Sequence, residues 1–152
     1  MQLEQVVSPV LGALNPVTTM GFDFVAPPGL RGEVRVVSFT GREAMSDLFS
    51  FDILLSSPFL QQESSELEAK LLGQPAALVL HAVEQSTRVV PGIVASFDLE
   101  GAIERTGEPC VRVRLVPRLW LTTQRRRSRI FQEMTVPAIV DAVLGQWQVA
   151  HA

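Results

Sequence analysis

The sequence predicts a mainly β fold with a minor share of helix, in which five or six antiparallel strands form a barrel or a sandwich. Apolar residues alternate with polar or basic ones over several short segments, which is the period-two pattern of strands. Glycine and proline separate these segments at short intervals. Helix signals occur in one short inserted segment and in one segment towards the C-terminus. Strand-rich chains with close turns favour a barrel or a sandwich over an open sheet.

Strands are predicted in the first part of the chain wherever apolar residues alternate with polar ones. They span residues 21–26, 33–40 and 49–55. Gly41 is expected to end the second strand, and residues 43–48 fit a single helical turn. Residues 1–20 show no sustained period and contain two prolines and a glycine. This stretch is therefore predicted to be an extended arm.

A short helix and a buried strand are predicted next. Ser65 and Glu68 have the spacing of a capping box, which predicts a helix over residues 66–72 that Gly73 ends. Residues 77–83 are apolar on both faces. A strand covered on both sides is expected to show this pattern.

A long strand is predicted over residues 87–100, with a bulge or a bend at Pro91 and Gly92. Beyond that point, period-two alternation places these apolar side chains on one face: Ile93, Ala95, Phe97 and Leu99. A polar hairpin loop over residues 101–109 leads into a further strand, which contains Val111.

A helix is predicted after Thr135, which can cap its first turn. Pro137 lies in that first turn, where proline is tolerated. The apolar residues that follow recur at helical spacing: Ile139, Val140, Val143, Leu144 and Trp147.

One segment combines a strand pattern with dense positive charge. Residues 111–131 read VRVRLVPRLWLTTQRRRSRIF, in which apolar residues first alternate with arginine before Pro117. An apolar group follows, and its Trp120 is expected to pin the turn to the core. The segment then carries a cluster of arginines: Arg125, Arg126, Arg127 and Arg129.

The charge is unevenly distributed along the chain, whose net charge is −3. Residues 1–104 contain five basic and thirteen acidic residues, a net charge of −8, whereas residues 105–129 contain eight basic residues and one acidic residue, a net charge of +7. All basic residues except Lys70 are arginine, which suits planar pairing with carboxylates or phosphates. We interpret the basic segment as an assembly surface that meets acidic residues of another copy. A solvated loop and a nucleic-acid site are the alternatives, although the acidic remainder and the lack of interleaved aromatic residues argue against nucleic acid.

The sequence offers little for catalysis, for metal binding or for a cofactor. Neither His81 nor His151 lies near a second plausible metal ligand, and the glycines are too dispersed for a phosphate-binding loop. Cys110 and His81 can meet across adjacent strands, but a working nucleophile also needs an orienting third group. We therefore predict no catalytic, metal-binding or cofactor-binding residue and no small-molecule substrate, and the chain is not expected to be an enzyme.

The composition indicates a folded protein made in a reducing compartment. A hydrophobic share of 47% is enough for a core, and the single cysteine excludes an internal disulfide. No apolar run reaches the roughly 18 residues that a membrane-spanning helix needs. The first fifteen residues lack the positive start and the continuous apolar core of a secretory signal peptide.

Several blocks of the chain resemble, in order and spacing, the VgrG family of type VI secretion spike proteins, which is similar in turn to the baseplate hub of contractile phage tails. The blocks are FTGREAMSDLFSFDI, LLGQPAALVL, GIVASF, RLVPRLWL and SRIFQEMTVPAIVDAVL. The resemblance covers residues 19–148, with small departures such as Pro91 and Gly92, where the family usually has His-Gly. Family members continue through the rest of the hub, an oligonucleotide-binding-type barrel and a needle, and these later parts are expected to be absent from this chain.

The resemblance implies an antiparallel β-barrel of the phage-tail hub or tube-domain type, with residues 1–18 as an arm and residues 19–152 as the N-terminal part of the hub. It implies a structural role in a contractile injection machine, as part of a homotrimer that docks the hexameric inner tube protein (Hcp) and helps to deliver effectors. A membrane would be met only through the missing needle. The expected location is the bacterial cytoplasm before firing, followed by secretion or injection without a signal peptide.

Two sets of residues are predicted to carry this role. The assembly interface is predicted to consist of Arg118, Arg125, Arg126, Arg127 and Arg129. The core anchors are predicted to be Phe51, Phe97, Trp120 and Phe131. The alternative functions are a module that loads an effector or adaptor protein and, less favoured, a nucleic-acid-binding domain that uses the arginines at 125–129.

Overall fold

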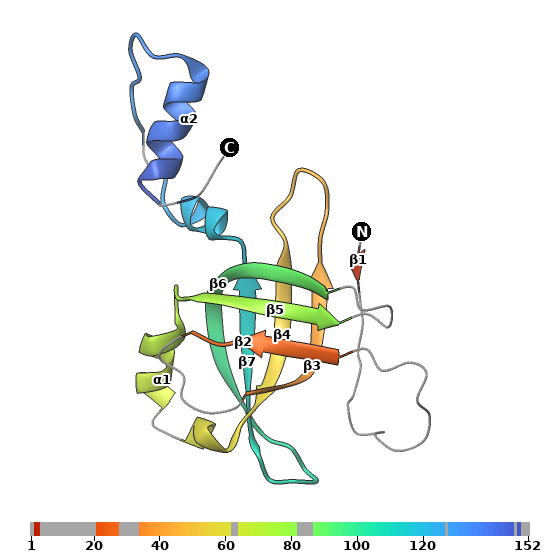
Figure 1. The fold of residues 1–152 in the computed structure, drawn as a ribbon. Helices are drawn as coiled ribbons and strands as arrows, with labels where there is room; N and C mark the ends of the chain where they lie inside the picture. The colour runs from red at the N-terminus through yellow and green to blue at the C-terminus, as the bar shows by residue number, and fades with distance from the viewer. Residues whose placement is uncertain are drawn as a thin grey trace. The chain divides into compact units, whose positions relative to one another are not determined.

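The computed structural model of the chain divides into two compact units, Met1–Val116 and Pro117–Ala152. It describes residues 2–3, 21–27, 34–61, 64–81, 87–126, 128–147 and 149. The strands of the first unit are β1 (Gln2–Leu3), β2 (Gly21–Val25), β3 (Arg35–Arg42), β4 (Ser50–Ser56), β5 (Pro75–His81), β6 (Thr87–Ala102) and β7 (Pro109–Val116). This unit also contains the 3₁₀ helix η1 (Pro58–Gln61) and the helix α1 (Ser64–Leu71), and the second unit contains the 3₁₀ helix η2 (Arg118–Gln124) and the helix α2 (Val136–Gly145) (Figure 1).

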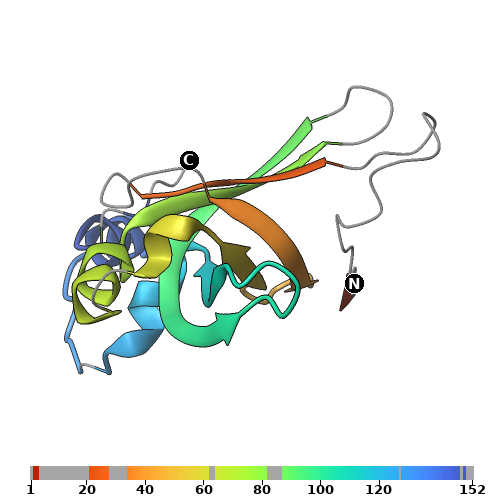
Figure 2. The same ribbon diagram turned by 90° about the horizontal axis from the view of Figure 1, so that it is seen from below.

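Strands β2 to β7 close into an antiparallel barrel. They follow the order β3-β2-β5-β6-β7-β4, and the sheet closes because β4 also pairs with β3. Among the described residues, the seam between β2 and β3 shows one residue pair, Asp23 with Arg35, whereas β1 pairs with the far end of β3. Figures 1 and 2 show β2, β5 and part of β6 lying across β3, β4 and β7. The predicted antiparallel β fold is thus confirmed, and it is a barrel.

The core lies inside the barrel, where inward side chains of every barrel strand meet. The inward row of β4 consists of Phe51, Ile53 and Leu55, which are 1%, 0% and 1% exposed. It packs beside the inward row of β7, in which Leu115 and Val113 pair with Phe51 and Ile53. A series of phenylalanine rings extends this core from β4 through β3 to β2, with ring centroids 6.2 Å and 5.0 Å apart.

The inserted helices contribute to the same core. Leu60 of η1 and Leu71 of α1 are each 2% exposed and belong to the core cluster. The end of α1 is tied to β6 by two backbone hydrogen bonds, from the Gly73 amide to the Val94 carbonyl and from the Val94 amide to the Gln74 carbonyl. The helix starts at Ser64, so Ser65 lies within it and not at the predicted cap.

Gly41 does not end β3, as predicted, but allows the core to form there. The strand continues to Arg42, and Gly41 pairs with Phe51 on β4. A Cβ atom at Gly41 would lie 2.2 Å from Cε1 of Phe51, so the phenylalanine ring occupies the space that a side chain would need. The predicted helical turn over residues 43–48 is also wrong, because these residues form a turn in which Ser46 has φ 60°.

The predicted interruption of β6 is displaced along the strand. Pro91 and Gly92 pair regularly with β5. The irregularities occur in the pairing with β7, between Val94 and Ser96 and between Leu99 and Gly101. Because a bulge inserts one extra residue, it exchanges the faces of the residues that follow. Ile93 therefore does not share a face with Phe97, contrary to the prediction.

The second unit contains one predicted helix and one that the sequence did not predict. Thr135 caps α2 as expected, with the Ala138 amide donating to Thr135 Oγ1 over 3.4 Å. The residues after Pro117 form η2, for which no helix was predicted. In the part of the chain that the structure describes, no helix has the length and apolar content that a membrane crossing requires.

We predict that Gly41→Ala destabilises the full chain by about 1–3 kcal/mol, because the added methyl group displaces the Phe51 ring from a filled core. Chemical denaturation measures this change. Gly145→Ala is the matched control, because a Cβ atom there meets nothing within 4 Å. Equal unfolding midpoints for the two variants would contradict the role given to Gly41.

Candidate assembly surfaces

The arginines of β7 form hydrogen bonds with carboxylates of the neighbouring barrel strands. Arg114 lies opposite Asp52 on β4, and its Nε and Nη2 atoms donate to the two carboxylate oxygens over 2.8 Å and 3.4 Å. Arg112 donates from Nε to Glu100 of β6 over 2.5 Å. These pairs neutralise part of the basic segment, so its positive charge is not all available to a partner.

The pKa values of these groups reflect their pairing. The hydrogen bond from Arg112 lowers the pKa of Glu100, and the same contact raises the pKa of Arg112. The hydrogen bond to Asp52 likewise raises the pKa of Arg114. The carboxylate and guanidinium groups thus favour their charged forms, which are the forms that hold neighbouring strands together.

A second polar cluster links β3, β4 and the loop before β7. Ser56, which is 1% exposed, donates from Oγ to Glu108 Oε2 over 2.7 Å, and Arg35 pairs with the same carboxylate. A hollow of about 380 Å³ lies beside this cluster, and Asp23 and Phe22 are among the residues that line it. Because the cluster satisfies its own polar groups, we assign it a structural role.

Two of the predicted interface arginines hold the second unit together. Arg118 donates from Nε to the Trp147 carbonyl over 2.9 Å, which connects η2 to the segment after α2. Arg129 donates from Nη2 to Gln146 Oε1 over 2.6 Å. Both side chains therefore position the residues around them, whatever else they contact.

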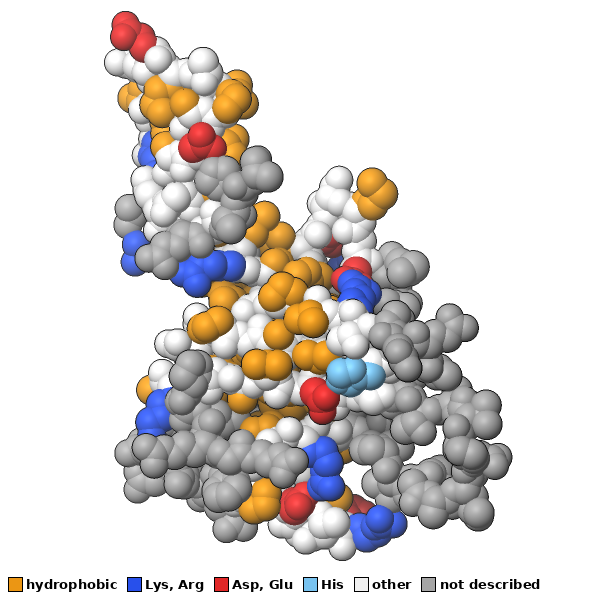
Figure 3. Space-filling model, in the orientation of Figure 1, with side chains coloured by type: hydrophobic (Ala, Val, Ile, Leu, Met, Phe, Trp, Pro, Cys, Tyr) orange, Lys and Arg blue, Asp and Glu red, His pale blue; other side chains and the backbone are white. Residues whose placement is uncertain are grey.

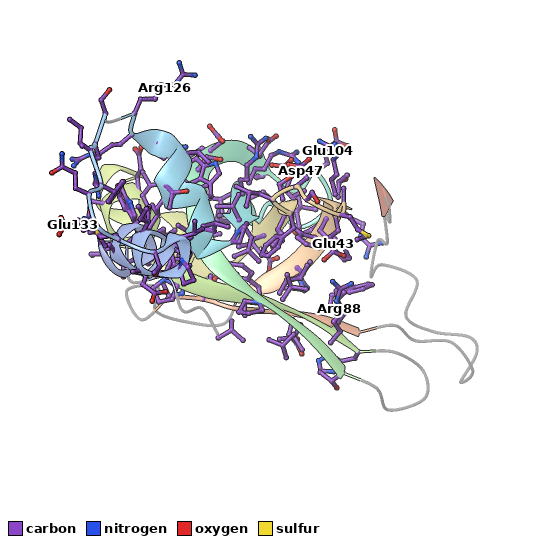
Figure 4. The ribbon with its side chains drawn as sticks, turned by 90° about the horizontal axis from the view of Figure 1, so that it is seen from above. Glu43, Asp47, Arg88, Glu104, Arg126 and Glu133 are labelled. Atoms are coloured by element: carbon purple, nitrogen blue, oxygen red, sulfur yellow. The ribbon has the colours of Figure 1, made fainter. Side chains whose placement is uncertain are left out.

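Arg125 and Arg126 are exposed, and the structure shows no ion pair for either among the described residues. In Figure 4, the Arg126 side chain points away from the ribbon. Arg127 lies outside the described residues. We call Arg125 and Arg126 the arginine surface.

The four predicted core anchors fall into two groups. Phe51 lies in the barrel core, and Phe97 is half-buried and packs against it. Trp120 and Phe131 are half-buried residues of the second unit. The proposed anchoring of the turn by Trp120 remains a prediction.

The outside of the barrel carries an apolar surface that the list of predicted interface residues missed. Strand pairing aligns three rows across β2, β5 and β6, and side chains of alternate residues point outward. The outward apolar residues, which we call the outer apolar face, are Val25, Ala77, Val79, Val89 and Pro91. Val25 is 56% exposed and Val89 is 55% exposed. Figure 3 shows hydrophobic side chains gathered on this side of the barrel, beside a histidine.

A signal for this face was present in the sequence. Residues 77–83 are apolar on both faces in the sequence, which predicts a strand covered on both sides. The structure provides the inner cover, in which Ala76 and Leu78 are buried, whereas Val79 on the opposite side is only half-buried. Apolar residues on the solvent side of a sheet mark candidate interaction surfaces.

The second unit also exposes apolar side chains. No residue of η2 or α2 is buried. Ile130 is 87% exposed and Val136 is 74% exposed, and Val140 on α2 is 44% exposed. A helix this apolar is normally buried against other protein.

The residues considered for chemistry lie apart. Cys110 is buried in β7, and burial raises the pKa of its thiol, whereas His81 lies on β5, which does not neighbour β7. His81 Nε2 lies 2.8 Å from Asp23 Oδ2 on the outside of the barrel. His151 lies outside the described residues, and among those described no group of three potential ligands could hold a metal ion.

The chain is similar in sequence and structure to known proteins of phage tails and of type VI secretion. Residues 42–152 match the family model of the phage tail baseplate hub (GPD). The chain is 32% identical over 132 residues to the type VI secretion system spike protein VgrG4b of Pseudomonas aeruginosa, covering 87% of this chain and 15% of that protein. It is 36% identical over 115 residues to VgrG5 of the same organism, covering 76% of this chain and 13% of that protein. These matches confirm the resemblance to the VgrG family.

A solved structure shares the fold. It is that of the E. coli c3393 protein, described as a component of the type VI secretion system with structural similarity to the T4 bacteriophage tail proteins gp27 and gp5. The TM-score is 0.62 at 28% identity, covering 83% of this chain and 31% of that one. The predicted barrel of the phage-tail hub type is thereby confirmed.

We predict that Arg112→Gln raises the pKa of Glu100 towards that of an ordinary carboxyl group, because the charged hydrogen bond is lost. Carboxyl NMR titration of the full chain measures this change. Since the folded-state pKa is lowered, the pair stabilises the fold above the unfolded pKa, and this contribution is lost as the pH falls through the folded value. Arg42→Gln, which removes a partner of Asp47, is the control. A Glu100 titration that is the same in wild type and Arg112→Gln would contradict the assignment.

Proposed function

The chain belongs to the phage tail baseplate hub (GPD) family, and on this premise we propose that it is a structural part of the hub of a type VI secretion spike. It spans 13% to 15% of the length of the spike proteins that it matches, so the proposal concerns the hub portion. Its role is to form contacts with other subunits, and it is given no catalytic step. Before firing it would reside in the bacterial cytoplasm, and it would then be secreted or injected by a non-classical route.

The outer apolar face is the observation that carries this proposal. The barrel already has a filled core, so Val25 and Val89 contribute nothing to it from the outside. Because these valines are about half exposed, burying the rest of one of them against a partner is worth about 1–2 kcal/mol. A subunit in a ring uses two different patches, because each copy meets its neighbours through unlike surfaces. The outer apolar face supplies one such patch for a homotrimer.

The arginine surface supplies a second patch. Residues 117–152 contain five arginines and two acidic residues, a net charge of +3, whereas the remaining residues carry −6. Arg125 and Arg126 have no acidic partner among the described residues, so an acidic surface can pair with them. We assign this surface to contact with the inner tube protein or a neighbouring hub subunit, and effector delivery would follow from that assembly. Complementary charge across such a contact fixes orientation and accelerates association.

We predict that Arg126→Glu weakens capture of the purified inner tube protein about tenfold, because attraction is replaced by repulsion. Biolayer interferometry with the full chain measures this at several salt concentrations, and wild-type binding should weaken as salt rises. Arg105→Glu is the matched control, since it makes the same charge change at an exposed position of the first unit. Equal capture by the wild type and by both variants, at every salt concentration, would reject the arginine surface as the contact.

A further inference from the structure

The second unit contains a small pocket that the proposed assembly role does not explain. Its volume is about 240 Å³. Its walls come from η2, from the loop that follows and from the region of α2: Thr122, Arg125, Arg129, Phe131, Val143 and Trp147. All of these residues belong to the second unit. The volume is smaller than that of a typical cofactor site and suits one or two amino-acid side chains.

The polar side of the pocket is formed by guanidinium groups for which the described residues supply no carboxylate partner. Arg129 donates to Gln146 Oε1, a neutral acceptor. Arg125 makes no hydrogen bond to another described residue. A guanidinium group has five donors, so both arginines retain donors for a ligand. Two positive charges around one hollow favour a carboxylate, which arginine binds through paired hydrogen bonds.

The remaining wall of the pocket is apolar. Phe131, Val143 and Trp147 are each half-buried and line it. Their surfaces favour an aliphatic or aromatic group beside the carboxylate. The hydrogen bond from Arg118 to the Trp147 carbonyl fixes the segment that carries the indole ring. The pocket thus joins a charged side to an apolar side in one built site.

We propose that this pocket binds an acidic side chain of a partner protein together with the apolar residue next to it in the partner's sequence. The inference rests on the proposed assembly role, because it specifies which feature of an acidic partner Arg125 of the arginine surface recognises together with Arg129. Arg125 pairs with the carboxylate from one side and Arg129 from the other, while the adjacent apolar side chain packs on Phe131 and Trp147. The partner segment therefore carries an acidic residue next to a large apolar one.

The test uses the full chain labelled with ¹⁵N and short peptides blocked at both ends, with glutamate or glutamine before phenylalanine. The indole N–H signals of Trp147 and Trp120 are followed by NMR, and Trp120 serves as the internal control because it does not line the pocket. We expect the glutamate peptide to shift the Trp147 signal saturably at millimolar concentration. The glutamine peptide should bind about tenfold more weakly, because the charged hydrogen bonds are lost. Equal shifts with both peptides, or an unmoved Trp147 signal, would overturn the proposal.

Two further comparisons identify the groups involved. Arg125→Gln should weaken the glutamate peptide about tenfold, whereas Arg105→Gln, the same change at an exposed position of the first unit, should leave its affinity unchanged. The structure shows no side-chain hydrogen bond or ion pair of Arg125 within the described residues, and the side chain is exposed, so this variant should fold normally. A peptide whose only carboxylate is its free C-terminus tests the source of the carboxylate, and tighter binding of this peptide would overturn the assignment to a side chain. Unaltered binding by Arg125→Gln would overturn the site itself.

The peptide experiment and the tube-protein experiment can fail separately. Arg126 does not line the pocket, so its variant tests the assembly role without altering the site. If Arg126→Glu loses tube binding while the glutamate peptide does not bind, the assembly role stands and the pocket proposal is rejected. If Arg126→Glu binds the tube protein normally and the peptide also fails, the arginine surface is rejected as the tube contact and the pocket proposal is rejected as well.

Discussion

The pairing of β4 with both β3 and β7 is the constraint on which the first unit depends, because it closes the sheet into a barrel. The closure places Phe51 inside, opposite Leu115 on one side and Gly41 on the other. Gly41 leaves the space that the phenylalanine ring fills, and Asp52, the next residue, points outward to Arg114. A closed sheet has fewer free strand edges for association. The barrel is therefore left with its outer side chains as the main means of joining other molecules.

Closure also divides the basic segment into two parts with different roles. Arg112 and Arg114 lie on a barrel strand, where carboxylates of neighbouring strands hold them. Arg125 and Arg126 follow η2 in the second unit and have no acidic partner among the described residues. Some arginines of the basic segment thus connect neighbouring strands, and others are exposed on the surface. Only the second part is available for assembly.

Much of the fold could be predicted because alternating apolar residues mark strands directly, and the blocks resembling VgrG identified the barrel type. The predictions that were wrong concern positions where tertiary packing overrides the local preference of the residue. Gly41 was predicted to end the strand because glycine often interrupts regular secondary structure. In the fold, the missing side chain of Gly41 leaves the space that the Phe51 ring occupies. The predicted faces of β6 were wrong after Val94, because period-two alternation assumes that the strand pairs without interruption. The bulge between Val94 and Ser96 shifts the register by one residue and so exchanges the faces.

The candidate surfaces were predictable only in part. The charge count identified the arginines, but the pairing of Arg112 and Arg114 depends on strand register, which the sequence does not show. The apolar residues at 77–83 indicated part of the outer apolar face in the sequence. That Val25 and Val89 belong to the same face could be seen only from the pairing of β2, β5 and β6. The pocket brings Arg125 beside Trp147, a proximity that no local pattern encodes.

Sedimentation equilibrium of the full chain over a range of concentrations tests most directly whether the exposed surfaces serve assembly. We predict a concentration-dependent species of about 50 kDa, three times the 16.7 kDa chain. Val89→Asp should return it to monomer, because a charge then occupies the outer apolar face. A monomer at every concentration, or a trimer that Val89→Asp leaves intact, would contradict the assignment of that face.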